Sequence, residues 1–186
     1  TQVTYEDITK TGAIVGSGGM IVMDEDTCMV DMARYFLNFT RDESCGKCNY
    51  CRIGTKRLLE ILTRITEGEG RDGDIELLQE LATKVMQGSL CGLGQTAPNP
   101  VLSTIRHFRN EYEDHIYNHK CTAHSCKALI EFSINDKCKG CTLCARNCPV
   151  GAITGSVKQM HVIDKEKCIK CGKCLDNCKF GAIDKI

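Results

Sequence analysis

The sequence lacks several features that would place it in a familiar class. It has no tryptophan, only 5% aromatic residues and three prolines in 186 residues. An ordinary apolar core would therefore be thin, and we expect bound metal to contribute part of the folding energy. There is no signal peptide and no apolar run long enough to cross a bilayer, which argues against a secreted protein and a membrane protein.

The chain also lacks net charge, because 24 basic side chains balance 24 acidic ones. Without a basic excess, we do not expect nucleic acid as a partner. Cysteine, in contrast, is abundant, with 15 residues. Disulfide scaffolds of this density are short and secreted, whereas these cysteines stand in tight Cys-x2-Cys arrays that suit metal centres. We therefore predict one or two domains in a reducing, cytoplasmic location.

Residues 1–25 are predicted to be the end of a domain. Two apolar runs, 13–15 and 20–23, flank a Gly-Ser-Gly-Gly turn, which is typical of two strands joined by a tight turn. The turn is not a dinucleotide loop, because Ile21 stands where that fingerprint requires its third glycine. No nucleotide or flavin site is therefore expected in this stretch.

Residues 26–112 are predicted to form four helices. Apolar residues recur at helical spacing in 29–39, after Cys51 and in 74–88, and a fourth helix is expected to start near Asn99 and Pro100. The expected ends are an N-cap for the first helix and a C-cap for the third. The candidates for these caps are Asp24, Asp26 or Thr27 at the first helix and Gly88 at the third.

Three cysteines with Cys-x2-Cys-x2-Cys spacing, Cys45, Cys48 and Cys51, lie between the first two predicted helices. They suit a 4Fe-4S cluster whose fourth ligand is the next cysteine along the chain, Cys91. Zinc is the alternative, but zinc sites use two separated pairs of ligands more often than a triplet and a remote single residue. The spacing therefore favours iron and sulfide.

The segments ESCGKCNYCRIGTKRLLEIL and GSLCGLGQTAPNPVLSTIRHF resemble the C-terminal helical bundle of the NADH-oxidising, FMN-containing subunit of respiratory complex I. The resemblance implies a 4Fe-4S cluster on Cys45, Cys48, Cys51 and Cys91 that receives electrons from a flavin. It also implies that residues 1–25 end a β-grasp domain and that FMN and NAD(H) bind upstream of this chain.

Residues 134–186 contain an internal repeat, DKCKGCTLCARNCPVGAI and EKCIKCGKCLDNCKFGAI. Each copy has the Cys-x2-Cys-x2-Cys-x3-Cys spacing of bacterial two-cluster ferredoxins, in which the fourth cysteine serves the other cluster. Lys179 departs from this pattern, because the first copy has Pro149 at the same place. Two 4Fe-4S clusters are predicted, one on Cys138, Cys141, Cys144 and Cys178, the other on Cys168, Cys171, Cys174 and Cys148.

Three cysteines remain outside the arrays: Cys28, Cys121 and Cys126. Cys28 is interpreted as a small buried apolar residue, because free cysteine is commonly buried. The other two lie in the sequence HIYNHKCTAHSC, which has the composition of a metal site without the spacing of a cluster site.

Residues 113–133 are therefore predicted to be a hinge with a zinc site, since thiolates and imidazoles together suit tetrahedral zinc. His115, Cys121 and Cys126 are the expected ligands. The alternative is two free thiols and solvated histidines in a linker. Three residues are candidates for the fourth ligand, in decreasing order of preference: His119, His124 and Cys28.

The predicted fold class is α+β: the end of a β-grasp domain, a four-helix iron–sulfur bundle, the hinge and a ferredoxin-like two-cluster module. This order is similar to the C-terminal part of the beta subunit of NAD(P)-dependent, electron-bifurcating hydrogenases. The resemblance implies electron transfer between flavin, ferredoxin and hydrogenase through three 4Fe-4S clusters. It implies three partners: the hydrogenase catalytic subunit, a small 2Fe-2S subunit and soluble ferredoxin.

The chain itself shows no acid–base pair or nucleophile, so no catalytic residue is predicted within it. Two alternatives to the hydrogenase interpretation stay open. Related NAD-dependent formate dehydrogenases share this kind of subunit, and the arrays could instead belong to a non-redox zinc module with a structural role.

Overall fold

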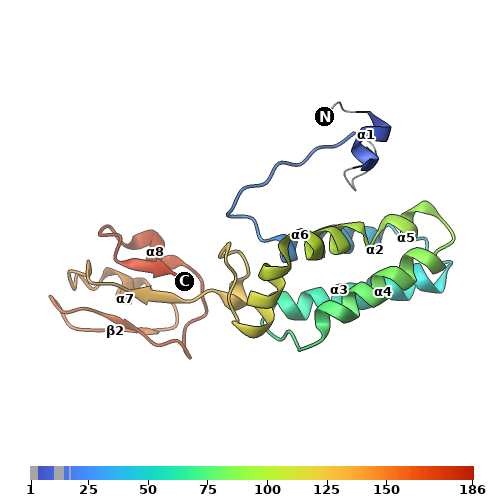
Figure 1. Ribbon diagram of the computed structural model, residues 1–186. Coiled ribbons are helices and arrows are strands. Elements are labelled where there is room, and N and C mark those ends of the chain that lie inside the picture. Colours follow the sequence, from blue (N-terminus) through green and yellow to red (C-terminus); the bar gives the residue numbers. More distant parts are fainter. Residues whose placement is uncertain (1–3, 11–14, 17) are drawn as a thin grey trace.

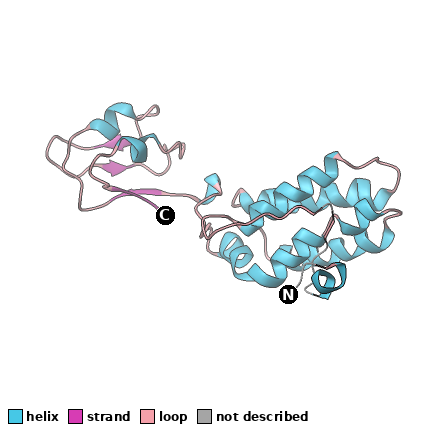
Figure 2. Cartoon of the chain, turned by 90° about the horizontal axis from the view of Figure 1, so that it is seen from above, coloured by secondary structure: helices cyan, strands magenta, loops and turns pink. Residues whose placement is uncertain are grey.

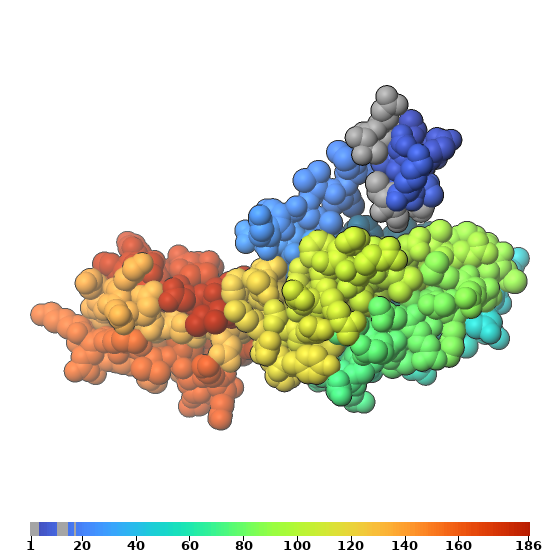
Figure 3. All heavy atoms as spheres, viewed as in Figure 1, coloured from blue at the N-terminus to red at the C-terminus, as the bar shows by residue number. Residues whose placement is uncertain are grey.

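The computed structural model describes residues 4–10, 15–16 and 18–186. These residues form a helical bundle and a smaller module, which have separate apolar cores and lie end to end (Figures 1 and 3). None of the helices in the described ranges has the length and apolar character needed to cross a bilayer.

The bundle confirms the four helices expected from hydrophobic periodicity. Their bounds are Met29–Asp42 for α2, Asn49–Thr66 for α3, Asp74–Gly88 for α4 and Asn99–Tyr117 for α6. A short helix that the sequence did not predict, α5 (Gly92–Thr96), follows Cys91. The apolar stripes of the long helices meet in one core, which includes the fully buried Leu37, Leu58, Leu62, Ile65 and Leu78.

The N-cap of α2 differs from the prediction. Cys28 occupies that position, and its Sγ accepts a hydrogen bond from the Asp31 backbone N–H at 3.5 Å. Thr27 instead donates from its hydroxyl to Asp24 at 3.1 Å. The chain therefore enters α2 one residue later than the oxygen-bearing candidates suggested.

The end of α4 also differs, because Gly88 is the last helical residue and Ser89, in an extended conformation, is the C-cap. Gly88 has a different reason to lack a side chain. A Cβ there would lie 2.4 Å from the ring of Tyr50 at the start of α3. The glycine therefore allows close approach of two helices.

The N-terminal segment forms α1 (Tyr5–Lys10), which buries no residue, and residues 18–24 run toward the bundle as an extended stretch (Figure 1). Residues 13 and 14 of the first expected strand lie outside the described residues. The strand expected at 20–23 is not formed, and its side chains are exposed, with Met20 at 85% and Val22 at 82%. A strand needs a hydrogen-bonded neighbour, and the described part of the chain offers these residues none.

The C-terminal module is built around two small antiparallel sheets (Figure 2). The first strand of the module pairs with the last, β1 with β4, and β2 pairs with β3. This pairing gives the two copies of the repeat equivalent surroundings. The bounds are Phe132–Ile134 for β1, Leu143–Asn147 for α7, Ile153–Thr154 for β2, Val162–Ile163 for β3, Lys173–Asn177 for α8 and Ile183–Lys185 for β4.

The border between the two cores lies between neighbouring residues. Leu129, at the end of the 3-10 turn η1 (Lys127–Leu129), packs with the bundle, whereas Ile130 packs with the module. The module therefore begins a few residues before the expected start at 134. Cys121 and Cys126 belong to the bundle core, so most of the predicted hinge is packed against the bundle.

Candidate metal-binding sites

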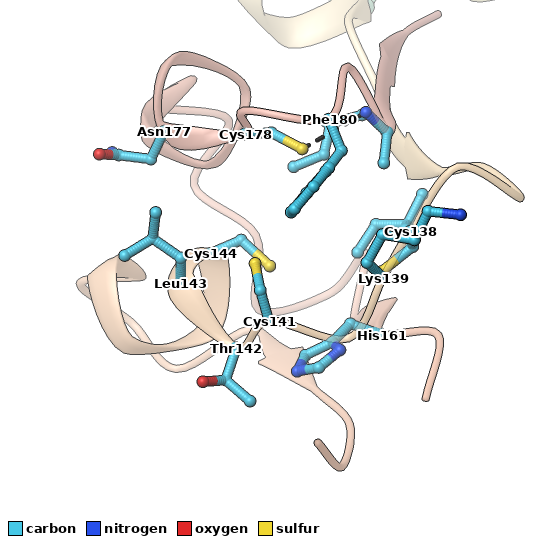
Figure 4. Close-up of a pocket in the computed structure, with 13 residues that line it drawn as sticks. Cys138, Lys139, Cys141, Thr142, Leu143, Cys144, His161, Asn177, Cys178 and Phe180 are labelled. Atoms are coloured by element: carbon cyan, nitrogen blue, oxygen red, sulfur yellow. Dashed lines mark hydrogen bonds between the residues drawn. The ribbon is translucent and has the colours of Figure 1, made fainter. Parts of the chain in front are cut away.

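The module contains two cavities lined by cysteines from both copies of the repeat. We call the first cysteine cavity the one lined by Cys138, Cys141, Cys144 and Cys178 (Figure 4). The second cysteine cavity is lined by Cys148, Cys168, Cys171 and Cys174. The structure thus brings together each set of four residues that the spacing assigned to one cluster.

The local fold of the repeat presents the cysteines in the same way in both halves. The third cysteine of each copy lies in a five-residue helix, α7 or α8, and the fourth is the C-cap of that helix. The Ala152 and Ala182 backbone N–H groups donate to Cys148 and Cys178 Sγ, each at 3.3 Å. Such bonds fix the direction of the sulfur and stabilise its thiolate.

Burial raises the pKa of Cys144 and of Cys174, the more enclosed cysteines of the two cavities. Removal of water favours the neutral thiol over the charged thiolate. A bound cation would reverse this preference, because coordination deprotonates a thiol outright. Four cysteines around one cavity are a ligand set that suits such a cation.

The bundle array, which comprises Cys45, Cys48, Cys51 and Cys91, lies where α3 and α5 begin. Cys48 is the N-cap of α3, Cys51 is in its first turn and Cys91 is the N-cap of α5. The pKa of Cys48 is lowered by the Leu90 backbone N–H and then by that of Cys51, so the turn before α5 reaches the start of α3.

The sulfurs of the bundle array have unequal exposure. Cys51 is buried and its Sγ lies 3.2 Å from the Ser44 hydroxyl, whereas Cys45 and Cys91 are exposed. A Cβ at Gly94 of α5 would lie 3.1 Å from the Cβ of Cys51, so α5 packs closely over the array. The structure thus places the Cys91 turn over the triplet, as expected from the sequence.

A fourth site joins the bundle to the predicted hinge. The Cys/His group comprises Cys28, His115, Cys121 and Cys126, whose ligand atoms all lie within 4.8 Å of one another. All four residues are buried, and His115 is 0% exposed. The three expected ligands therefore come together, and the fourth member of the group is Cys28.

The order of preference for the fourth ligand was therefore wrong. His119 is exposed, and neither it nor His124 belongs to the group. The sequence contains no local signal for Cys28, because it is 87 residues from His115 along the chain. Only the packing of α2 beside α6 brings the two together.

The distances within the Cys/His group fit a tetrahedral metal. His115 Nε2 lies 3.4 Å from both Cys28 Sγ and Cys126 Sγ, and these sulfurs are 3.8 Å apart. Zn–S bonds of about 2.3 Å and a Zn–N bond of about 2.0 Å at tetrahedral angles give S···S of about 3.8 Å and S···N of about 3.5 Å. His115 Nδ1 donates to the Glu111 carbonyl at 2.7 Å, which leaves Nε2 free to bind a metal.

The buried members of the group also shift one another's pKa values. Hydrogen bonds from Cys126 and Cys28 lower the pKa of Cys121, and the pKa of Cys126 is raised by its contacts with Cys121 and Cys28. Burial acts to lower the pKa of His115, but hydrogen bonds to Cys121 and Cys28 outweigh it and raise that pKa to about 10. Three thiolates this close together would need a bound cation.

Comparison with known proteins identifies the two cysteine-rich parts. Residues 31–115 match the NADH-ubiquinone oxidoreductase-F iron-sulfur binding region, and residues 137–183 match the 4Fe-4S dicluster domain. Each match covers less than half of the chain, which is similar to these two iron–sulfur families over the ranges given. These matches confirm the resemblances drawn from the cysteine arrays. His115 is the last residue of the first match, and Cys28, Cys121 and Cys126 lie outside both matches.

The curated relatives include NADP-reducing hydrogenase subunit HndC of Solidesulfovibrio fructosivorans, 55% identical over 160 residues. That match covers 86% of this chain and 33% of the relative. An NADH-quinone oxidoreductase subunit of Rhizobium meliloti is 38% identical over 120 residues, which is 64% of this chain and 28% of that protein. This chain therefore spans about a third of the length of these relatives.

A solved structure is also similar, that of an NAD+-reducing NiFe-hydrogenase in the H2-reduced state. Its sequence identity is 34% and its TM-score 0.49, over 51% of this chain and 17% of that one.

Proposed function

We propose that this chain is the electron-transfer part of an NAD(P)-dependent, electron-bifurcating hydrogenase. In this proposal three 4Fe-4S clusters relay electrons between a flavin, soluble ferredoxin and a hydrogenase partner. The observation that carries it is the grouping of eight cysteines from two repeats into two cavities of four, in a chain that also has the bundle array.

The residues of all three sites fit iron–sulfur clusters. The bundle cluster uses Cys45, Cys48, Cys51 and Cys91, and each module cluster uses the four cysteines of one cavity. Sulfur ligands that are partly buried and hydrogen-bonded are the means by which a protein holds a cluster and sets its potential. When bound, the clusters supply one-electron chemistry, and the chain supplies their position and surroundings.

The two cluster-bearing parts are far apart, which supports separate roles for them. Helix α3 begins at the bundle array and ends beside Gly68, where a Cβ would lie 3.0 Å from Leu129 at the edge of the module. Eighteen helical residues are about 27 Å long. Figure 1 accordingly shows α5 at the end of the bundle remote from α7 and α8. The bundle cluster is thus suited to the main electron path from the flavin to the hydrogenase partner. The module is suited to a branch that exchanges electrons with soluble ferredoxin.

The partners of the proposal follow from the hydrogenase relative. The match to HndC extends over 160 of 186 residues, so it necessarily includes residues 27–160 and reaches into the module. We propose the hydrogenase catalytic subunit, a small 2Fe-2S subunit and soluble ferredoxin as partners, without nucleic acid or membrane, in the cytoplasm. FMN and NAD(H) bind to the upstream part of the full-length protein.

The Cys/His group is proposed to hold a structural zinc ion. Three cysteines and one histidine are a common ligand set for structural zinc, which is closed to substrate and does not change redox state. The ion joins the start of α2 and the last turn of α6 to the segment that leads into the module. It therefore fixes the base of the module on the bundle.

The test of the proposed function uses the full-length protein assembled with its partner subunits. Hydrogen should reduce NAD(P)+ and ferredoxin through the complex, and formate should not. Reduction by formate in place of hydrogen would establish the formate dehydrogenase alternative. A colourless, iron-free protein that is folded would establish the zinc module instead, because iron–sulfur clusters are coloured and zinc is not.

A further inference from the structure

A histidine that the cluster assignment does not use lies in the first cysteine cavity. His161 is 0% exposed and lines this cavity together with the four cysteines. Its ring is drawn beside Cys138 and Cys141 in Figure 4. Nδ1 donates to the Gln159 carbonyl at 3.1 Å, and Nε2 is buried without a hydrogen-bond partner among the described residues. A buried polar nitrogen is costly unless a bound group satisfies it.

Two glycines hold this histidine in the cavity. A Cβ at Gly155 would lie 2.6 Å from His161 Cγ, and one at Gly140 would lie 2.4 Å from the Gln159 backbone nitrogen. Lys158 N–H donates to the Gly140 carbonyl at 3.0 Å, which seats the loop against the segment that carries Cys138 and Cys141. Close backbone contacts at these two glycines therefore fix the position of the His161 ring.

The second cysteine cavity has phenylalanine at the equivalent place. Ile134 pairs with Ile183 in one sheet, and Ile163 pairs with Ile153 in the other. Phe132 is two residues before Ile134, as His161 is two residues before Ile163. Phe132 is 6% exposed and lines the second cavity. The two cavities thus have four cysteines each and the same fold around them. The first has an imidazole where the second has an apolar ring.

We propose that His161 donates a hydrogen bond from Nε2 to the cluster of the first cysteine cavity and gives it a higher reduction potential than the cluster of the second. This inference rests on the proposed function, because it requires both clusters. Sulfide and thiolate sulfurs accept hydrogen bonds, and reduction makes the cluster more negative by one electron. A donor therefore stabilises the reduced form and raises the potential.

Because Nδ1 donates to a carbonyl, donation from Nε2 requires a proton on both ring nitrogens. No bond forms or breaks in this step, and the electron comes from the flavin or ferredoxin of the proposed function. The cluster beside His161 is thus the one on which an electron rests within the module.

The experiment is a redox titration of the full-length holoprotein, followed by EPR, for the parent and three variants. His161→Phe copies the apolar ring of the second cavity, and we expect the potential of one module cluster to fall. A tenfold change in the reduction equilibrium is 59 mV for one electron, and we expect about this shift. His161→Gln keeps a donor and should retain most of the parent potential. Phe132→His should raise the potential of the other module cluster.

Iron and sulfide analysis of each variant separates failure of this inference from failure of the proposed function. A parent protein without iron in the module overturns both. With all clusters present, an unchanged potential in His161→Phe, or equal shifts of both module clusters, overturns the role of His161 alone. Should His161→Phe lose its cluster, Phe132→His decides: a raised potential supports the inference and an unchanged one contradicts it.

Discussion

Cys28 has two roles at the scale of a single residue. Its sulfur caps α2 by accepting from the Asp31 N–H, and the same atom lies 3.4 Å from His115 Nε2. Cys28 therefore ties the first helix of the bundle to the segment that enters the module.

The first prediction concerns this residue. Cys28→Ser should lose most of the zinc of the parent protein, because serine oxygen is a poor substitute for thiolate in a closed zinc site. Zinc per chain, measured by elemental analysis of the purified protein, is the test. His119→Ala is the matched control and should keep its zinc, since His119 is exposed and outside the Cys/His group. Full retention in Cys28→Ser, or equal loss in both variants, would contradict the assignment.

Sequence alone could predict most of the ligand groupings at this scale. Cys138 and Cys168 begin arrays whose spacing determines which sulfurs share a cavity, because the intervening turns are short. Cys28 could not be assigned in this way, since its partners lie across the bundle. The role proposed for His161 could not be predicted for a similar reason. It depends on a loop that contacts Gly140, and no local sequence pattern indicates that contact.

Helix α3 and helix α4 approach so closely that one position between them admits only glycine. A Cβ added at Gly54 of α3 would lie 2.2 Å from Val85 Cγ2 of α4. Val85 is 2% exposed, so its side chain has little room to move away. At the scale of elements, this contact determines how far apart the two helices pack.

The second prediction follows from that contact. A glycine-to-alanine change in an exposed helix raises the free energy of unfolding by about 0.8–1.0 kcal/mol. Gly54→Ala should instead lower the free energy of unfolding by about 1–3 kcal/mol, because the added methyl group overpacks the interface between α3 and α4. Denaturant titration of the holoprotein measures the change.

Two companion variants control for this result. Gly92→Ala in α5 adds a Cβ with nothing within 4 Å and should have little effect. Adding Val85→Ala to Gly54→Ala should make the two changes less than additive, since the smaller side chain makes room. A stabilised Gly54→Ala protein would show that the helices separate more easily than the structure indicates.

The third prediction concerns the connection between the same helices. Arg64 of α3 binds Asp74, the first residue of α4, through two hydrogen bonds, and the Asp74 side chain is 3% exposed. Asp74→Ala should lower the free energy of unfolding by about 3–5 kcal/mol, because a partly buried guanidinium loses its partner. Denaturant titration is again the measurement. Glu80→Ala, which breaks an exposed pair with Lys84, should leave the free energy of unfolding nearly unchanged.

Periodicity predicted the long helices because each has one stripe that faces a shared core. Leu58, Leu62 and Ile65 of α3 show this directly, since all three are fully buried. The strand expected at 20–23 failed for the complementary reason. Strand pairing is a contact between segments, and an apolar run carries no information about whether a neighbour is present.

At the scale of the whole molecule, the candidate metal sites lie at the ends of the bundle and within the module. The bundle array lies at one end of the bundle, the Cys/His group at the other, and the module follows across a border between Leu129 and Ile130. Few polar contacts cross that border, and one of them joins Lys170 Nζ to the Ala128 carbonyl at 2.5 Å. The bundle array and the Cys/His group therefore belong to one packed unit, and the two cysteine cavities belong to the other.

In the proposed function the bundle cluster and the module clusters form independently. Cys91 is the only cysteine placed to complete the bundle triplet, whereas the module needs no ligand from outside itself. The most direct measurement is therefore iron and acid-labile sulfide in the anaerobically reconstituted parent and in Cys91→Ala. We predict about twelve of each per parent chain and about eight per variant chain, from three and two four-iron clusters. About eight in the folded parent, or an undiminished twelve in the variant, would contradict the account.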